Sequence, residues 1–194
     1  MTKTSLIKDL VEKNNGILSC DLLAKNNIHR QYLKELVDQG YLVKIARGIY
    51  VLPEKDVNEF YILGQQFKTG IFSHNTALYF YNLTDRTPLT LDMTFPSNVR
   101  PSNFMLNPHY INKERHEIGM VTRKLEDGTT IKIYNMERTI CDIIRDRNKI
   151  DSQIFNTALK EYMKRKDKDL NLLYEYSKIF GISKILKMHL EILA

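Results

Sequence analysis

The N-terminal part of the chain alternates short apolar runs with breaks made of asparagine and glycine. From Leu6 to Val11 the apolar side chains recur at positions i, i+1, i+4 and i+5, which predicts a helix that Thr4 or Ser5 caps. A second, short helix is expected around residues 22–24, and a third from about His29 to Asp38. Each of them is followed by asparagine or glycine, which tolerate the left-handed conformation found at helix C-termini.

After the third helix the spacing of apolar residues changes from that of a helix to that of a strand. Residues 41–45 and 49–52 are rich in β-branched and aromatic side chains, and Arg47-Gly48 supplies the turn between them. Pro53 ends this predicted hairpin. Three short helices followed by a hairpin are the plan of a winged helix-turn-helix, a module that places one helix in the major groove of DNA.

A second change in the pattern, near residues 53–57, marks a boundary between two domains, because proline and charged residues gather there. We expect a DNA-binding domain over residues 1–55 and a second domain over residues 56–194. In the second domain the pattern predicts helices at about 57–70, 73–81, 136–147, 152–164, 170–180 and 183–193, a strand at 90–95 and a hairpin over 118–134. Prolines and asparagines predict a loop-rich segment over 96–116. The expected fold class is α+β: an N-terminal winged helix-turn-helix followed by a mixed α/β C-terminal domain that ends in helices.

Composition narrows the class of protein further. With 43% apolar and 27% charged residues, the chain can bury a core. It has no apolar run long enough for a membrane span, and its N-terminus lacks the apolar stretch of a signal peptide. The two cysteines, Cys20 and Cys141, form no disulfide framework, which is typical of a reducing compartment. We therefore expect a cytoplasmic protein that has no membrane contact.

The net charge of +6 has two interpretations. Residues 1–55 hold nine Lys and Arg against six Asp and Glu, so half of the positive excess lies on little more than a quarter of the chain. This distribution fits attraction to a polyanion such as nucleic acid. On charge alone, it fits ordinary surface lysine equally well.

Six polar side chains of the first domain are candidates for contact with DNA. They are His29, Arg30, Gln31 and Lys34, which face away from the apolar stripe of the third helix, and Lys44 and Arg47 on the wing. Arginine pairs with guanine and glutamine with adenine, whereas lysine is better suited to phosphate. Taken by itself, His29 is more easily explained as a helix-start residue than as a base reader. The alternative is a winged module used for protein contact, with its charges in solvent.

Familiar catalytic motifs are absent from the sequence. It has no glycine-rich phosphate loop, no nucleophile elbow and no metal-ligand spacing among its five histidines and two cysteines. A metal-dependent nuclease would need an acidic residue on one strand and an acid-x-lysine triplet on the next. Asp92 fits the first position, but the triplet reads Thr130-Ile131-Lys132. We expect no enzyme activity, no metal and no cofactor, and we keep a nuclease targeted by the winged helix as an alternative function.

Several polar residues of the second domain have structural explanations. Ser73 is expected to cap a helix, with His74 packed or hydrogen-bonded at the start of that helix. Arg138 and Asp142 lie four positions apart, which predicts a local ion pair on one helix face. Asp127 belongs to an Asp-Gly turn.

Three segments resemble the AbiE-type abortive-infection antitoxins, in the order expected for that family. The wing, GYLVKIARGIYVLP, is similar to the hairpin of the winged helices that open these antitoxins. The segments FSHNTALYFYNLTDRTP and NMERTICDIIRD resemble two helices of the family's second domain. The residues that carry the likeness in these two segments are Ser73, Ala77, Leu78, Asp85, Arg138, Thr139 and Asp142.

The resemblance implies an antitoxin of a bacterial type IV toxin–antitoxin pair, which acts in abortive infection as a phage defence. In that family the N-terminal domain represses its own operon by binding inverted repeats in promoter DNA. The C-terminal domain is needed to counter a nucleotidyltransferase-like toxin, without a stable complex between the two proteins.

Overall fold

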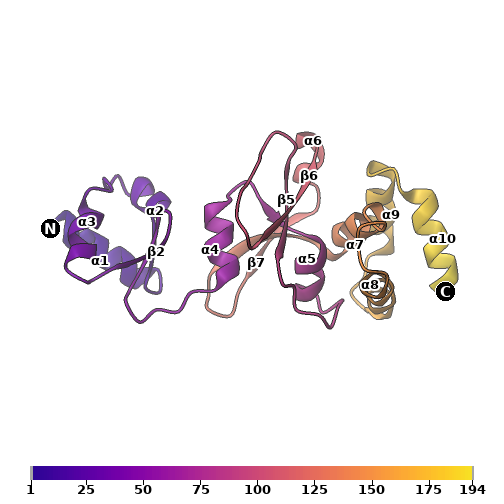
Figure 1. The fold of residues 1–194 in the computed structure, drawn as a ribbon, viewed down its shortest axis with the longest axis horizontal. Coiled ribbons are helices and arrows are strands. Elements are labelled where there is room, and N and C mark those ends of the chain that lie inside the picture. The colour runs from indigo at the N-terminus through magenta and orange to yellow at the C-terminus, as the bar shows by residue number, and fades with distance from the viewer. Residues whose placement is uncertain (1, 194) are drawn as a thin grey trace. The chain divides into compact units, whose positions relative to one another are not determined.

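The computed structural model describes residues 2–193 (Figure 1). Contacts divide the chain into two compact units. The first unit comprises the residues up to Lys68 and the segment Lys124–Thr130, and the second comprises Thr69–Arg123 and the residues from Ile131 onward. The α+β class is confirmed, with helices and a small sheet in the first unit and a mixed sheet with helices in the second. The predicted domain over residues 1–55 lies inside the first unit, and its boundary stays a prediction.

Three helices begin the first unit: α1 (Lys3–Lys13), α2 (Cys20–Lys25) and α3 (Tyr32–Asp38). Helix α1 begins before the predicted caps because the Thr2 hydroxyl accepts a hydrogen bond from the backbone N–H of Ser5, at 3.2 Å. Helix α3 begins three residues later than predicted. A turn at residues 30 and 31 precedes it, where Nδ1 of His29 accepts the backbone N–H of Gln31 at 3.3 Å.

The wing has three strands rather than the predicted two: β1 (Ile17–Ser19), β2 (Val43–Ala46) and β3 (Ile49–Val51), in the order β1-β3-β2. Both pairs are antiparallel. The β1 strand is too short for an alternating pattern to show in the sequence. The predicted turn at Arg47 and Gly48 is confirmed, and the φ of +77° at Gly48 explains why glycine suits this position.

Two apolar clusters hold the first unit together. Helices α1 to α3 pack around fully buried side chains that include Ile7 and Leu36. Helix α4 (Glu59–Gln66) brings Ile62 against Ile49 and Val51 of the wing. The wing is therefore covered by a helix that follows the winged module in sequence.

The second unit is built on a mixed sheet of β4 (Ile71–Phe72), β5 (Leu91–Pro96), β6 (Leu106–Ile111), β7 (Met120–Lys124) and β8 (Thr130–Tyr134). The strand order is β6-β5-β4-β8-β7. Strand β5 pairs antiparallel with β4 and parallel with β6, and β4 pairs parallel with β8. The predicted strand at 90–95 and the predicted hairpin over 118–134 are confirmed.

The expectation of a loop-rich segment over residues 96–116 is wrong in part. Strand β6 and the short helix α6 (Lys113–His116) lie within it. Strand β6 contains Pro108, which cannot donate to a strand ladder, but β6 is the last strand in the sheet order and an edge strand tolerates proline. The prolines and asparagines that predicted a loop therefore mark the edge of the sheet.

Helix α5 (His74–Phe80) packs against strand β5, and α7 (Met136–Arg145) packs against α5. Helices α8 (Ser152–Lys164), α9 (Leu170–Ile179) and α10 (Ser183–Leu193) pack in turn against α7. Figure 1 shows α7, α8, α9 and α10 gathered beyond α5 on one side of the sheet. Apolar residues of these five helices and their connections form one core cluster, and α7 is buried along most of its length. Within residues 2–193, none of the helices combines the length and the apolarity that a membrane crossing requires.

Candidate functional site

All six side chains predicted to contact DNA are exposed on the first unit. Arg30 and Gln31 lie just before α3, and Lys34 lies in its first turn. Lys44 is on β2, and Arg47 is in the turn of the wing. The buried Leu33 and Leu36 anchor the opposite face of α3 in the core. The winged module therefore offers these polar groups to a partner without any rearrangement of its core.

The exposed part of α3 carries both signs of charge. Glu35 and Asp38 are exposed on the same helix as Lys34. The Glu35 carboxylate accepts a hydrogen bond from the Gln39 side chain, at 3.2 Å. A phosphate backbone would be attracted to the lysine and repelled by these carboxylates, so α3 by itself is not a purely cationic surface.

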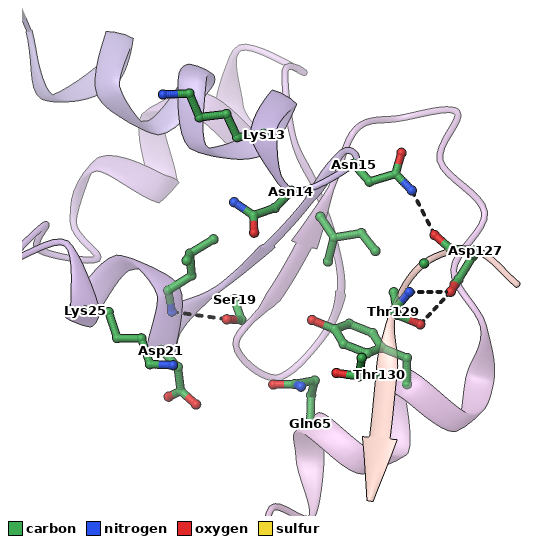
Figure 2. A pocket seen from close by; sticks show the side chains of 14 residues that line it. Lys13, Asn14, Asn15, Ser19, Asp21, Lys25, Gln65, Asp127, Thr129 and Thr130 are labelled. Carbon is green, nitrogen blue, oxygen red and sulfur yellow. Dashed lines mark hydrogen bonds between the residues drawn. The ribbon is translucent and has the colours of Figure 1, made fainter. Parts of the chain in front are cut away.

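A polar pocket of about 480 Å³ is also found in the first unit (Figure 2). Its lining includes Lys13, Asn15 and Asp127. The Asn15 side chain donates to the backbone carbonyl of Asp127 at 2.9 Å. One carboxylate oxygen of Asp127 accepts from both the backbone N–H and the hydroxyl of Thr129, as Figure 2 shows. The predicted Asp-Gly turn is confirmed here, with a φ of +85° at Gly128.

The residues that carry the antitoxin resemblance in the second unit are mostly core residues. Six of them are fully buried: Ser73, Ala77, Leu78, Arg138, Thr139 and Asp142. Asp85 alone among the seven is exposed. In this structure the six buried residues shape the fold of the second unit and do not lie on its surface.

The ion pair predicted within α7 is confirmed, and both of its partners are completely buried. Nε of Arg138 donates to the two carboxylate oxygens of Asp142, each at 3.1 Å. Its Nη1 donates to the backbone carbonyls of Arg115 and Ile118, at 3.0 and 2.7 Å. The remaining Nη2 has no hydrogen-bond partner in the described part of the chain. The guanidinium therefore ties α7 to α6 and to the residues that connect α6 with β7.

Ser73 stands at the N-cap position of α5, but its hydroxyl makes no cap hydrogen bond, contrary to our expectation. It accepts instead from the Thr94 hydroxyl at 2.8 Å and lies 3.0 Å from Nδ1 of His74. The other ring nitrogen of His74, Nε2, lies 3.0 Å from Oδ2 of Asp146. His74 adopts a φ of +45°, an uncommon conformation for a residue other than glycine. The expected hydrogen-bonded histidine at the helix start is confirmed.

A second histidine packs against the first. The rings of His74 and His109 are stacked, with centroids 3.5 Å apart and planes at 9°. Nε2 of His109 lies 2.6 Å from Oδ1 of Asp92, and the Asn107 amide donates to the same oxygen at 2.7 Å. We call the group made by His74, Asp92, His109 and Asp146 the histidine cluster.

The surroundings of the histidine cluster shift its titration. Burial lowers the pKa of His74, and the hydrogen bond to Asp146 opposes this effect. The hydrogen bond from His74 and the charge of Arg145 hold the pKa of Asp146 well below its usual range. At neutral pH, His74 therefore faces an ionised carboxylate.

Sequence reasoning missed the histidine cluster as a unit. It placed Asp92 on a strand and His109 in a loop, and it gave Asp146 no role. His74 is separated from His109 by 35 residues and His109 from Asp146 by 37, so no local spacing reveals the set. The nuclease pattern is not assembled either, because Thr130–Lys132 lie on β8, and β4 stands between β8 and the β5 strand of Asp92.

Comparison with known proteins bears on the first unit. Residues 5–53 match the model of a family described as transcriptional regulator, AbiEi antitoxin. The N-terminal module is similar to this family. This match confirms the AbiE-type resemblance, and it ends at Pro53, before the segments of the second unit that resemble AbiE antitoxins. The curated proteins contain no match to the chain.

Proposed function

We propose that this protein is an AbiEi-type antitoxin that also represses its own operon by binding inverted repeats in promoter DNA. The observation that carries the proposal is the exposure of six polar side chains around the start of α3 and on the wing of an AbiEi-type module. In a winged helix-turn-helix, residues near the N-terminus of the recognition helix contact base edges. Arg30 and Gln31 directly precede the first residue of α3, Tyr32.

The wing is proposed to contact the DNA backbone. Lys44 and Arg47 belong to the β2–β3 hairpin and are exposed, and Lys34 is exposed on α3. Cations at these three positions would position the module on phosphates, while Arg30 and Gln31 would read the sequence. His29 is held by its hydrogen bond to the backbone of Gln31, so we propose that it orients the turn before α3.

The second unit is proposed to carry the antitoxin activity, against a nucleotidyltransferase-like toxin and without a stable complex. The resemblance of two of its segments to AbiE antitoxins supports this assignment. Because six of the seven residues that carry the resemblance are buried, we propose that they maintain the fold on which the activity depends. Asp85, which is exposed, is the residue of this set that can meet another molecule directly. We propose a cytoplasmic regulator that is not an enzyme.

A titration of the full chain with its promoter DNA tests the proposal. The double substitution R30A/Q31A is expected to weaken binding to the promoter far more than binding to unrelated DNA. One good base contact discriminates by about 1–3 kcal/mol, which corresponds to roughly 5- to 150-fold in affinity. The control is K160A, which removes one positive charge from the exposed surface of α8 in the second unit.

Equal promoter affinity of wild type and R30A/Q31A would contradict base reading by these side chains. If the wild type showed no salt-dependent binding to any DNA, the module would instead serve protein contact. Cleavage of the DNA on addition of Mg²⁺ would favour the alternative nuclease.

A further inference from the structure

We propose that His74, His109 and Asp146 bind a divalent transition-metal ion, zinc before others, in the second unit. Each of the three residues offers one ligand atom, and these atoms all lie within 4.8 Å of one another. They come from three separate elements: the first residue of α5, strand β6 and the C-cap of α7. The proposal does not rest on the proposed DNA and toxin functions.

The distances in the histidine cluster are already near those of a metal site. With bonds of 2.0–2.1 Å to nitrogen and oxygen, two ligands of a tetrahedral zinc ion lie about 3.3 Å apart. Nε2 of His74 and Oδ2 of Asp146 are 3.0 Å apart. A ligand atom of His109 lies within 4.8 Å of both, and the His109 ring must shift and turn to complete such a set.

The hydrogen bonds of His74 are compatible with metal binding. The Ser73 oxygen accepts from the Thr94 hydroxyl and retains a lone pair for the N–H of His74 Nδ1, 3.0 Å away. In that tautomer the lone pair of His74 is on Nε2, on the side of Asp146. Ser73 thus holds the ring in the orientation that a ligand requires, while a rotation of its hydroxyl serves the other tautomer when no ion is bound.

His109 has the outer partner that ligating histidines usually have. Its Nε2 lies 2.6 Å from the Asp92 carboxylate, which is itself fixed by the Asn107 amide. A carboxylate on one ring nitrogen orients the ring and raises the basicity of the other nitrogen, and this arrangement is common around zinc. Nδ1 is then the nitrogen left for the ion. Because the rings of His74 and His109 are nearly parallel, binding is expected to tilt them so that their lone pairs converge.

The charged groups around the site balance one another. Asp142 pairs with Arg138 and Arg145, and Asp146 pairs with Arg145 and with the exposed Lys149 at 3.8 Å, while Asp92 faces His109. With neutral histidines the three carboxylates and three cations sum to zero, so the net charge does not itself select a cation; the donor atoms do.

The ligand atoms indicate which ion the site binds, and the exposure of the three side chains indicates how open the site is. Two imidazole nitrogens and one carboxylate oxygen suit zinc and its neighbours in the first transition row, whereas magnesium and calcium prefer sites made of oxygen alone. The side chain of His74 is 1% exposed, and those of His109 and Asp146 are 19% exposed. The open side of the site therefore leaves a fourth position for water, as three-ligand zinc sites do.

Metal titration of the full chain, with any affinity tag removed and after dialysis against a chelator, tests this proposal. We expect uptake of one Zn²⁺ per chain by calorimetry, visible d–d absorption of tetrahedral Co²⁺, and a rise in melting temperature with Zn²⁺. H109A and D146A are expected to abolish the Co²⁺ absorption. D92N, which alters only the outer partner, is expected to lower the affinity 10- to 100-fold.

Two variants serve as controls. H29A removes an exposed histidine of the first unit, and C20S removes a thiol that is partly exposed in the same unit; both are expected to bind as wild type does. Circular dichroism checks the fold of each variant, and any variant of the cluster that is unfolded is replaced by its conservative form, H109Q or D146N. Failure of the folded wild type to bind Co²⁺ or Zn²⁺, or wild-type binding by folded H109A and D146A, would overturn the proposal.

Discussion

At the scale of single residues, the second unit contains a close approach between Gly119 and the buried Arg138. The Arg138 guanidinium stacks between the rings of Tyr134 and Phe180, each 4.1 Å from its central carbon. Gly119 lies against the aliphatic stem of this arginine with a φ of +79°. A side chain on Gly119 would place its Cβ only 2.6 Å from Cβ of Arg138 and 3.2 Å from the Asn135 oxygen that caps α7.

Gly119→Ala is therefore expected to destabilise the protein more than Gly181→Ala does. Gly181 also has a positive φ, +69°, but no atom lies within 4 Å of the position of its Cβ. Both variants incur the cost of a left-handed residue, roughly 1–2 kcal/mol. Only Gly119→Ala adds overpacking against a buried side chain, typically about 1–3 kcal/mol more.

Urea unfolding followed by circular dichroism measures this difference. Both glycines belong to the second unit, so the comparison does not mix the stabilities of two units. Equal unfolding midpoints for the two variants would show that the chain around Gly119 relaxes, and that the approach to Arg138 is not a constraint on the fold.

At the scale of elements, the sequence predicted the turns and helices that depend on neighbouring residues. It missed the strands that form only because a distant strand pairs with them. The Asn and Gly breaks, the Arg47-Gly48 turn and the helix predicted at about 136–147 depend on residues close together in sequence, and the structure confirms them. Strand β1 is three residues long and exists because β3 lies beside it. Strand β6 contains Pro108 and exists because β5 pairs with it along six positions.

The three cations that we propose to contact phosphate lead to a prediction at the same scale. Lys34, Lys44 and Arg47 are exposed, and each phosphate that such a cation neutralises contributes roughly 0.9 to the slope of log K against log salt concentration. The triple alanine variant is expected to lower this slope by up to about 2.7 and to weaken binding to all DNA sequences alike. Binding titrations at several salt concentrations measure the slope.

A triple alanine variant of Lys160, Lys164 and Lys166 is the matched control. It removes the same number of positive charges from exposed positions in and just after α8 of the second unit. A slope that falls equally in both variants would indicate a general effect of net charge. An unchanged slope in the variant of Lys34, Lys44 and Arg47 would mean that these three side chains stay in solvent when DNA is bound.

At the scale of the whole molecule, the sequence predicted two modules but not the groups that the second module brings together. The segment that is similar to the AbiEi family is local and continuous, so its pattern is visible within residues 5–53. The histidine cluster joins α5, β5, β6 and the end of α7, which are brought together by the pairing of β5 with β6 and the packing of α5 against β5 and α7. The buried Arg138 is a second example. Its ion pair with Asp142 is predictable from their spacing in sequence, but its hydrogen bonds to the backbone carbonyls of Arg115 and Ile118 are not.

The division into two compact units suggests that promoter repression and antitoxin activity can be separated. R30A/K34A changes two exposed side chains of the first unit and leaves both cores intact. We expect this variant to lose repression of a promoter reporter, yet still rescue cells that express the toxin from an independent promoter. D85A, at an exposed position of the second unit, is expected to show the reverse: repression retained and rescue lost.

The two variants together distinguish separate modules from a single activity. Immunoblots and melting temperatures first establish that R30A/K34A and D85A accumulate and fold as the wild type does, since both substitute surface residues. Each then controls for the other, because a general loss of protein would remove repression and rescue alike. If well-folded R30A/K34A lost rescue as completely as repression, DNA binding would be part of the antitoxin mechanism, and the assignment of one activity to each unit would be wrong.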